Sequence, residues 1–166
     1  MKAYIAGPLF NDAEKAFNLK VDALVQSLGI QTYLPQRDGG ESIRLIREGQ
    51  PPEIIRRRLF ELDVSEVRAC DLLICILDGR VPDEGTCVEL GLAYILGKIC
   101  IGYQTDSRRF ALDYNNLMIE NALNGGFAQS LDELTNLIKA AIQRISTTEH
   151  LTHLHEDTCS NDGANT

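Results

Sequence analysis

The chain has 166 residues, of which 44% are hydrophobic and 24% charged, a composition typical of one globular domain. Lys and Arg number 16 and Asp and Glu number 24, so the formal net charge is −8. This acidic balance disfavours a protein that wraps a nucleic-acid backbone, because that function calls for a basic surface, but it does not exclude a nucleoside as ligand.

The first part of the chain alternates an apolar run with an amphipathic one. Lys2–Gly7 predicts a buried strand, and Asn11 or Asp12 can cap a helix that ends near Leu28. A short strand is expected at Gln31–Leu34. The apolar face of the helix is expected to comprise Ala16, Leu19, Ala23 and Leu24.

Residues Gln36–Gln50 are rich in glycine and charge, which predicts a long loop with one short helical turn at 42–47. A loop of this length in a compact domain is more often functional than idle. The segment is therefore a candidate lid.

The remaining residues continue the alternation and end in a polar tail. The predicted elements are helices at Pro51–Ala69, Cys87–Leu96 and from Ser130 or Asp132 to about Ile145, a short helix or turn at Asn115–Leu123, and strands at Asp71–Asp78, Lys98–Tyr103 and Phe127–Gln129. This order predicts an α/β fold, a doubly wound, mostly parallel five-stranded sheet with helices on both faces. The domain is expected over residues 1–146, and the aperiodic residues 147–166 predict a disordered tail.

Five cysteines form no Cys-x-x-Cys pair, and this odd number predicts reduced thiols in a cytoplasmic protein. Cys87 is the cysteine nearest to the carboxylates of residues 83–89, but no histidine stands close to it in the sequence, which disfavours a thiol nucleophile. Gly7 and Pro8 break the N-terminal apolar run, so neither a signal peptide nor a transmembrane helix is expected.

The loop after the third predicted strand, Val81–Gly91, is the first place to look for chemistry, because open α/β sheets bind ligands at the carboxyl ends of their strands. Thr86 is a natural helix N-cap, and Glu89 follows three residues later. One interpretation is a capping box, in which Glu89 reaches back to the helix start. The other is a nucleophilic carboxylate that the helix dipole keeps anionic. The spacing alone favours the capping box.

Asp63 shares a predicted helix face with the apolar side chains of Leu59, Phe60 and Val67. A carboxylate that faces a core has a raised pKa, because burial disfavours its charged form. It is therefore either a functional acid or a residue at the edge of the apolar stripe that reaches solvent, and the spacing favours neither.

Several of these residues, taken in order, resemble the nucleoside 2-deoxyribosyltransferase family. The resemblance rests on four features: YIAGPLF near the N-terminus, an aspartate on the helix before the third strand, PDEGTCVELG after that strand, and NLM further on. The resemblance covers roughly residues 1–146. It implies a flavodoxin-like fold, which agrees with the sheet derived from the element order. It also implies transfer of a 2-deoxyribosyl group between nucleobases through a covalent glycosyl-enzyme intermediate, as in nucleoside salvage.

The resemblance assigns a role to four residues near the expected crevice. Glu89 would be the nucleophile that attacks the anomeric carbon, which now favours this interpretation over the capping box. Asp63 would protonate the leaving base, a role that its raised pKa suits. Tyr4 would hydrogen-bond and orient the nucleophile, and Asp83 would contact the nucleoside.

Further residues are implied as substrate contacts. Asn116 would come from a neighbouring subunit and bind the sugar hydroxyls, so the active protein is expected to be a homo-oligomer. Phe10 is a candidate wall against the base, and Gly7 stands in the same N-terminal substrate-binding segment. Gln36 and Asp38 are plausible contacts to the base.

The expected partners are small-molecule nucleosides and free nucleobases, with no nucleic-acid polymer and no membrane. No metal and no organic cofactor is implied, and the sequence contains no GxGxxG or GxxxxGK[ST] motif. Two alternatives remain open. One is an N-glycoside hydrolase of nucleosides or nucleoside monophosphates, and the other is a non-catalytic nucleotide-sensing domain.

Overall fold

The computed structural model describes the backbone of residues 1–39, 41–106 and 116–160 and the side chains of residues 1–39, 44–106 and 116–147. The strands are β1 Lys2–Ala6, β2 Gln31–Tyr33, β3 Leu72–Ile76, β4 Ile99–Tyr103 and β5 Gly126–Ala128. The helices are α1 Asp12–Ser27, α2 Pro35–Asp38, α3 Glu41–Arg47, α4 Pro52–Ala69, α5 Glu84–Ile95, α6 Leu117–Ala122 and α7 Leu131–Ser160.

The five strands form one sheet in the order β2-β1-β3-β4-β5, and every neighbouring pair is parallel. The predicted fold class is confirmed. The order runs from β1 outward to β2 in one direction and to β3 in the other, so β1 and β3 flank the point where the connections change sides. Open sheets of this kind bind ligands at that point.

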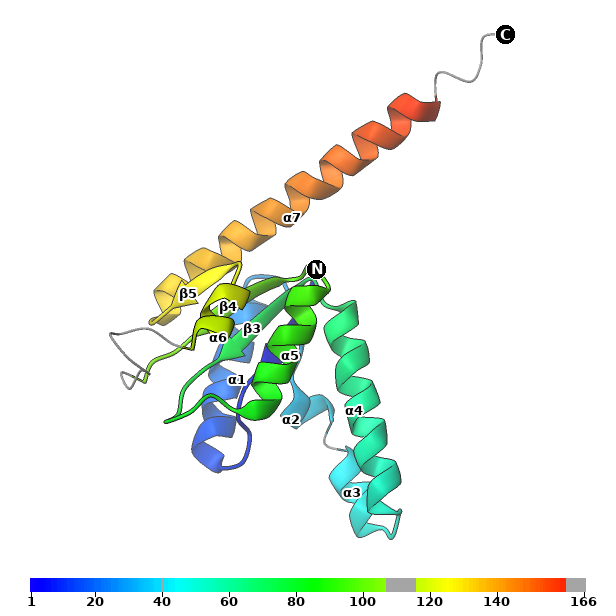
Figure 1. Cartoon of the computed structure of the whole chain (residues 1–166), viewed down its shortest axis with the longest axis vertical. Coiled ribbons are helices and arrows are strands. Elements are labelled where there is room, and N and C mark those ends of the chain that lie inside the picture. Colours follow the sequence, from blue (N-terminus) through cyan, green and yellow to red (C-terminus); the bar gives the residue numbers. More distant parts are fainter. Residues whose placement is uncertain (40, 107–115, 161–166) are drawn as a thin grey trace.

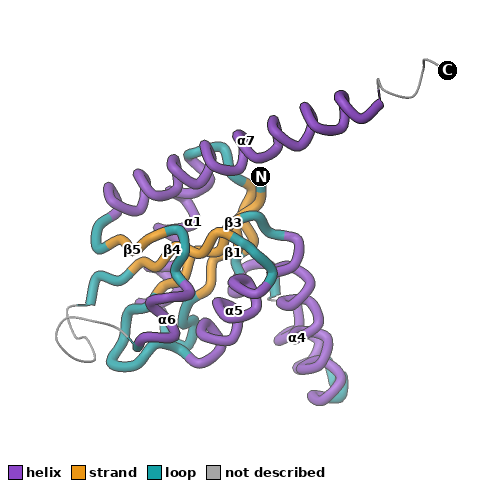
Figure 2. Tube along the Cα trace, turned by 45° about the horizontal axis from the view of Figure 1, so that its top comes forward, coloured by secondary structure: helices purple, strands orange, loops and turns teal. Residues whose placement is uncertain are grey.

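Helices cover both faces of the sheet (Figures 1 and 2). Successive residues of a strand point to opposite faces, so Ile5 packs towards α1 and α7 whereas Tyr4 packs towards α4 and α5. The central strands β3 and β4 are fully buried, as expected of parallel strands that are covered on both sides.

Three local predictions differ from the structure. The segment 36–50 is not one loop, because Pro35 begins the short helix α2, whereas the helical turn predicted at 42–47 is confirmed as part of α3. Helix α1 buries a different face from the expected one, since Leu19 is 50% exposed while Asn18 and Asp22 are buried. Helix α7 continues to Ser160, beyond the predicted end near Ile145. Residues 161–166 of the expected tail lie outside the described residues.

Helix α1 can bury Asn18 and Asp22 because both side chains form hydrogen bonds with neighbouring segments. Asn18 donates to the carbonyl of Pro8 and to Gln36, at 2.8 and 2.9 Å, and Asp22 accepts from Arg37 at 2.8 Å. Buried polar groups are tolerated when they are paired in this way. None of the described helices combines the length and the apolar character that spanning a bilayer requires.

Candidate active site

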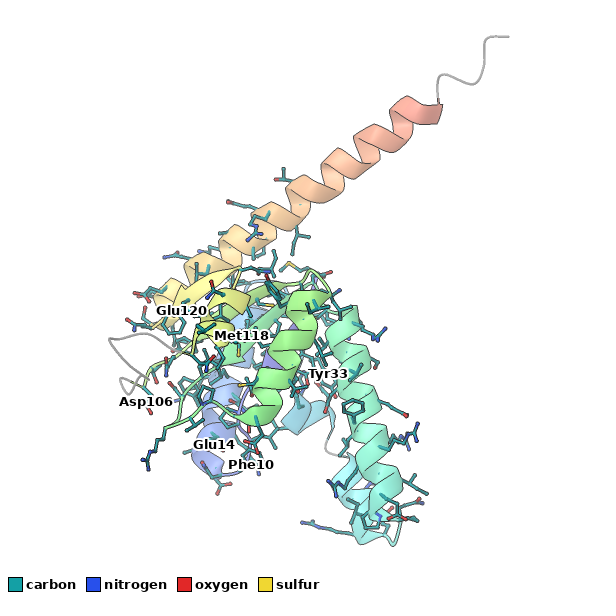
Figure 3. All side chains as sticks on the ribbon, in the orientation of Figure 1. Phe10, Glu14, Tyr33, Asp106, Met118 and Glu120 are labelled. Atoms are coloured by element: carbon teal, nitrogen blue, oxygen red, sulfur yellow. The ribbon has the colours of Figure 1, made fainter. Side chains whose placement is uncertain are left out.

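Two neighbouring strands place two tyrosines side by side. Tyr4 of β1 and Tyr33 of β2 are partners in the parallel register, and their ring centroids lie 5.2 Å apart at an interplanar angle of 30°. Both rings belong to the core under α4 and α5, and Figure 3 places Tyr33 between these two helices. The two hydroxyls therefore reach the same region of the molecule.

Helix α5 brings Glu89 to the first of these hydroxyls. Glu89 lies three residues after Thr86 and four before Ala93, both of which are buried against the sheet, so helical periodicity turns Glu89 towards the same side. The Tyr4 hydroxyl donates to Oε1 of Glu89 at 2.6 Å. Oε2 accepts no hydrogen bond from any residue that the structure describes.

The start of α5 differs from the prediction. Asp83, and not Thr86, is the N-cap, and its Oδ2 accepts from the backbone N–H of Thr86 at 2.8 Å and from its hydroxyl at 3.0 Å. Glu89 is thus in the second turn of the helix, too far along to close a capping box. The capping-box interpretation of Glu89 is wrong, because this carboxylate bonds to β1 and not to the helix start.

Helix α4 supplies the second carboxylate. Asp63 is half-buried, and its Oδ1 accepts from the Tyr33 hydroxyl at 3.1 Å. Of the apolar residues expected on the same face, Val67 is fully buried and Phe60 is exposed. Asp63 therefore lies at the edge of the apolar stripe, but it faces a tyrosine and a cavity.

Asp63 and Glu89 line one cavity of about 310 Å³ between α4 and α5. Its other walls are mostly apolar: Phe60, Val64, Val67, Gly85, Val88 and Leu92. An apolar pocket with two convergent carboxylates can hold a small molecule and act on it by acid, base or nucleophilic chemistry.

Burial has the largest effect on the pKa of both carboxylates. It raises the pKa of Glu89 to about 7, against the opposing effect of the Tyr4 hydrogen bond and with a further rise from the charges of Asp63 and Asp83. Burial also raises the pKa of Asp63, against the opposing effects of the Tyr33 hydrogen bond and of the nearby Tyr4 hydroxyl. Near neutral pH the two groups can hold a proton and a negative charge between them, which is the state that acid–nucleophile chemistry needs.

The residues of the N-terminal segment lie outside this cavity. Phe10 is 76% exposed at the start of α1 (Figure 3), and its N–H donates to Glu14. A Cβ on Gly7 would stand 3.0 Å from the Ile76 Cβ, so this position packs closely against β3. Pro8 lines a second cavity, of 410 Å³, on the α1 side of the sheet. Gly7, Pro8 and Phe10 are thus not among the residues that line the cavity of Glu89.

Asn116 is the N-cap of α6, where its Oδ1 accepts from the backbone N–H of Met118 at 2.9 Å. Its side chain is exposed and does not line the Glu89 cavity. Next to it, Leu117 and Met118 are 70% and 73% exposed, and they line a mostly apolar groove of 450 Å³ between α5 and α6. The groove lies on the other flank of α5 from the carboxylates.

The two plausible base contacts on α2 are engaged within the chain. Gln36 accepts from Asn18 and donates to the carbonyl of Lys15, while Asp38 accepts from the backbone of Leu34 and from Arg37. Tyr33, in contrast, was not among the predicted site residues. The signal that could have found it is an aromatic hydroxyl in the strand that precedes α2, but its partner Asp63 is 30 positions away in the sequence.

Comparison with known proteins supplies the context for this arrangement. A family model described as nucleoside 2-deoxyribosyltransferase matches residues 3–137. A conserved protein of Enterococcus faecalis V583 has a similar structure, with a TM-score of 0.68 and 28% identity over 84% of this chain and 98% of that one. No curated protein matches the chain.

Two similar structures carry an activity in their names. A 2-deoxyribosyltransferase of Bacillus psychrosaccharolyticus has a TM-score of 0.63 and 26% identity, over 82% of this chain and 91% of that chain. A CMP N-glycosidase of Clostridium botulinum has a TM-score of 0.52 and 17% identity, over 84% of this chain and 99% of that chain, a likeness of fold alone.

Proposed function

Because the chain belongs to the nucleoside 2-deoxyribosyltransferase family, we propose that it transfers a 2-deoxyribosyl group from one nucleobase to another, with Glu89 as nucleophile. The observation that carries this proposal is the hydrogen bond from Tyr4 to Glu89, a residue that lines one cavity together with Asp63. A family of this kind acts on small-molecule nucleosides and nucleobases, and the cavity is large enough to enclose much of such a molecule.

In the first step, Oε2 of Glu89 attacks the anomeric carbon of the bound nucleoside. A carbon–oxygen bond forms while the bond to the base nitrogen breaks, and the electron pair of that bond leaves with the base. Asp63 in its protonated form gives its proton to the departing base, and burial favours that form by raising the pKa of Asp63. The product is a glycosyl ester on Glu89.

In the second step, a nitrogen of the incoming base attacks the same carbon. The bond to Glu89 breaks, its electron pair returns to the carboxylate, and Asp63 takes up the proton that the incoming base loses. Two displacements at one carbon restore the original configuration, as in retaining glycosidases. Because Tyr4 holds Oε1, only the opposite oxygen of Glu89 faces the substrate in each step.

Asp83 can serve the helix and the substrate at the same time. Both of its hydrogen bonds to Thr86 end on Oδ2, and within the described residues Oδ1 accepts none. We assign Oδ1 to a donor on the nucleoside. Gly7 and Phe10 stay candidate substrate contacts at the N-terminal segment, where an incoming base would cover the exposed Phe10 ring.

Exposed groups on α5 and α6 support a site that is shared with a second copy of the chain. Asn116 Oδ1 caps α6, while its amide nitrogen donates to none of the residues that the structure describes. The adjoining exposed side chains of Leu117, Met118 and Ile95 give α5 and α6 an apolar face that a second copy would cover. We propose a homo-oligomer in which Asn116 reaches the sugar hydroxyls bound in the neighbouring subunit.

A mixing experiment tests this shared site. Glu89→Ala and Asn116→Ala are each expected to be inactive alone, but co-expression should restore activity because some mixed oligomers contain one intact site. For a dimer with random pairing, about a quarter of the parent activity returns. Absence of any recovery, in mixed oligomers that mass spectrometry confirms, would mean that Asn116 acts within its own chain or not at all.

Base exchange tests the activity itself. The parent protein is incubated with deoxyinosine and adenine, without phosphate, and the products are separated by chromatography. Glu89→Gln is run beside Glu84→Gln, a matched control that makes the same chemical change on the exposed first residue of the same helix. Deoxyadenosine from the parent and from Glu84→Gln, but not from Glu89→Gln, is the expected result.

Two other results would redirect the assignment. Hypoxanthine and free sugar without deoxyadenosine would mean that water is the acceptor and that the protein is an N-glycoside hydrolase. No reaction with a broad panel of nucleosides, despite binding, would favour the nucleotide-sensing domain. Location in the cytoplasm stays a prediction that rests on cysteine usage.

A further inference from the structure

We propose that Tyr33 is a positioning residue of the active site, which supplies Asp63 with a hydrogen-bond donor of its own and so keeps the single hydroxyl proton of Tyr4 on Glu89. This inference rests on the proposed function, since it names Asp63 and Glu89 as the acid and the nucleophile. It adds a residue to which no role in the reaction has been given above.

The two tyrosines form one rigid unit. They are register partners on adjacent parallel strands, their rings are stacked, and Tyr33 is only 6% exposed. Each ring is fixed at its backbone by the β-ladder and along its length by the other ring. Their hydroxyls therefore sit at a fixed spacing, and each one meets a different carboxylate.

The count of donors matters because a phenolic hydroxyl has only one proton. Asp63 and Glu89 line the same cavity, and the Tyr4 hydroxyl is close enough to both to lower the pKa of both. If Tyr33 lacked its hydroxyl, the two carboxylates would compete for the Tyr4 proton. With Tyr33 present, two donors face two acceptors, and Tyr4 can bond to Glu89 alone.

The surrounding charges do not substitute for this donor. Glu66 of α4 raises the pKa of Asp63 and, with Asp38 of α2, that of Tyr33. Lys2 of β1 forms an ion pair with Glu66, and its Nζ lies 6.0 Å from the centroid of the Tyr33 ring. The ammonium group of Lys2 is therefore paired with Glu66.

The test is Tyr33→Phe, which removes the hydroxyl and retains the ring that stacks on Tyr4. We expect kcat of base exchange to fall about tenfold, the size of effect for one lost hydrogen bond to a charged group, with KM nearly unchanged. The acid limb of the kcat–pH profile should move to higher pH, because both carboxylates lose part of the donation that stabilises their charged forms.

The matched control is Tyr103→Phe. Tyr103 is equally buried, but it lies on β4 and stacks on Phe17 under the opposite face of the sheet. Loss of this hydroxyl should leave kcat and its pH profile unchanged. A second comparison measures Tyr33→Phe in an Asp63→Asn background, where its effect on kcat should largely disappear because the acceptor is no longer a carboxylate.

A titration that needs no substrate separates the failure of this inference from the failure of the proposed function. Carboxyl-carbon NMR of glutamate-labelled protein follows Glu89, whose signal is identified by its loss in Glu89→Gln. A higher titration midpoint for Glu89 in Tyr33→Phe supports the two-donor arrangement even if the parent proves inactive. An unchanged midpoint, or a loss of kcat that is as large in the Asp63→Asn background, would reduce Tyr33 to a packing residue and overturn the inference.

Discussion

The hydroxyl of Tyr4 and Oε1 of Glu89 are 2.6 Å apart, although the two residues are 85 positions apart in the chain. The partly buried bond joins the interior strand β1 to the second turn of α5 on the α4–α5 side of the sheet. A short bond from a neutral donor to a carboxylate stabilises the anion and fixes the direction of its second oxygen.

Tyr4→Phe should therefore raise the pKa of Glu89 above about 7, because the lost hydrogen bond is what opposes the effect of burial. If Glu89 must be ionised to attack, kcat should fall most at acid pH and recover in part as the pH rises. The measurement is the kcat–pH profile of base exchange for the parent and the variant. A uniform loss at every pH would indicate that Tyr4 acts only through geometry.

Glu89→Gln should stabilise the fold at alkaline pH while it abolishes exchange. The pKa of Glu89 rises from 4.5 to about 7 on folding, so the folded state favours the protonated side chain. In the parent, the contribution of protonated Glu89 to the unfolding free energy is fully present below pH 4.5 and is lost as the pH rises through about 7. Glutamine resembles the protonated form, and its advantage at about pH 8 is at most about 3 kcal/mol.

Denaturant unfolding of Glu89→Gln and the parent at several pH values measures this difference. The difference in unfolding free energy should vanish below the pKa that Glu89 has in the unfolded state, because Glu89 of the parent is then protonated in both states. A difference that is the same at every pH would show that packing, and not the charge of Glu89, sets it.

Asp63→Asn should slow exchange according to how much the leaving base needs a proton. For ordinary purine nucleosides the loss of general-acid catalysis amounts to about 10²- to 10⁴-fold. A 2-deoxyriboside with a leaving group that departs as a stable anion should be nearly unaffected in the first step. Single-turnover release of the two leaving groups provides the comparison, and equal losses for both would remove Asp63 from the role of acid.

Asp83→Ala should cost about 1 kcal/mol of unfolding free energy, because α5 loses its N-cap bonds to Thr86. Asp83→Asn keeps an oxygen acceptor and should restore most of that stability. If Oδ1 also binds the nucleoside, Asp83→Asn should still raise KM. Thermal unfolding and steady-state kinetics of the two variants separate the two roles, and a parent-like KM in Asp83→Asn would limit the residue to the cap.

Gly7→Ala should destabilise the fold by about 1–3 kcal/mol, since overpacking forces neighbours apart. The new methyl group would stand 3.0 Å from the Ile76 Cβ and 3.2 Å from Asn18 Oδ1. Gly91→Ala is the control, because a Cβ at that helical position has no such neighbour within 4 Å and alanine favours the helix. Chemical denaturation of both variants measures the contrast, and equal stabilities would show that the chain after β1 accommodates the methyl group at position 7 without loss of stability.

The sequence could predict the fold class because the apolar strands and the helices alternate in a regular order. It could not predict the face of α1, since Asn18 and Asp22 are buried only where Gln36 and Arg37 of a distant helix pair with them. Helix α2 was missed for a related reason, whereas most of α3 was predicted as the helical turn at 42–47. Helix α2 is short and polar, and it is fixed by Pro35 and by hydrogen bonds from Gln36 and Arg37 to α1 more than by periodicity.

The candidate site was predictable as a set of residue types but not as a geometry. The resemblance named Glu89, Asp63 and Tyr4, and their predicted roles stay proposals. Which carboxylate meets which hydroxyl depends on the stacking of two strands and the approach of two helices, and no local pattern contains that information. For the same reason Tyr33 was not found.

The register between β1 and β2 determines where the Tyr33 hydroxyl lies relative to Asp63. Side chains alternate between faces along a strand, so a slip of one residue would carry the Tyr33 hydroxyl through the sheet to the α1 side, away from Asp63. A slip of two residues would keep the face but separate the rings by about 7 Å along the strand. Mutations in the turn between α1 and β2 can thus alter activity without touching the cavity, by changing where one strand stops against the other.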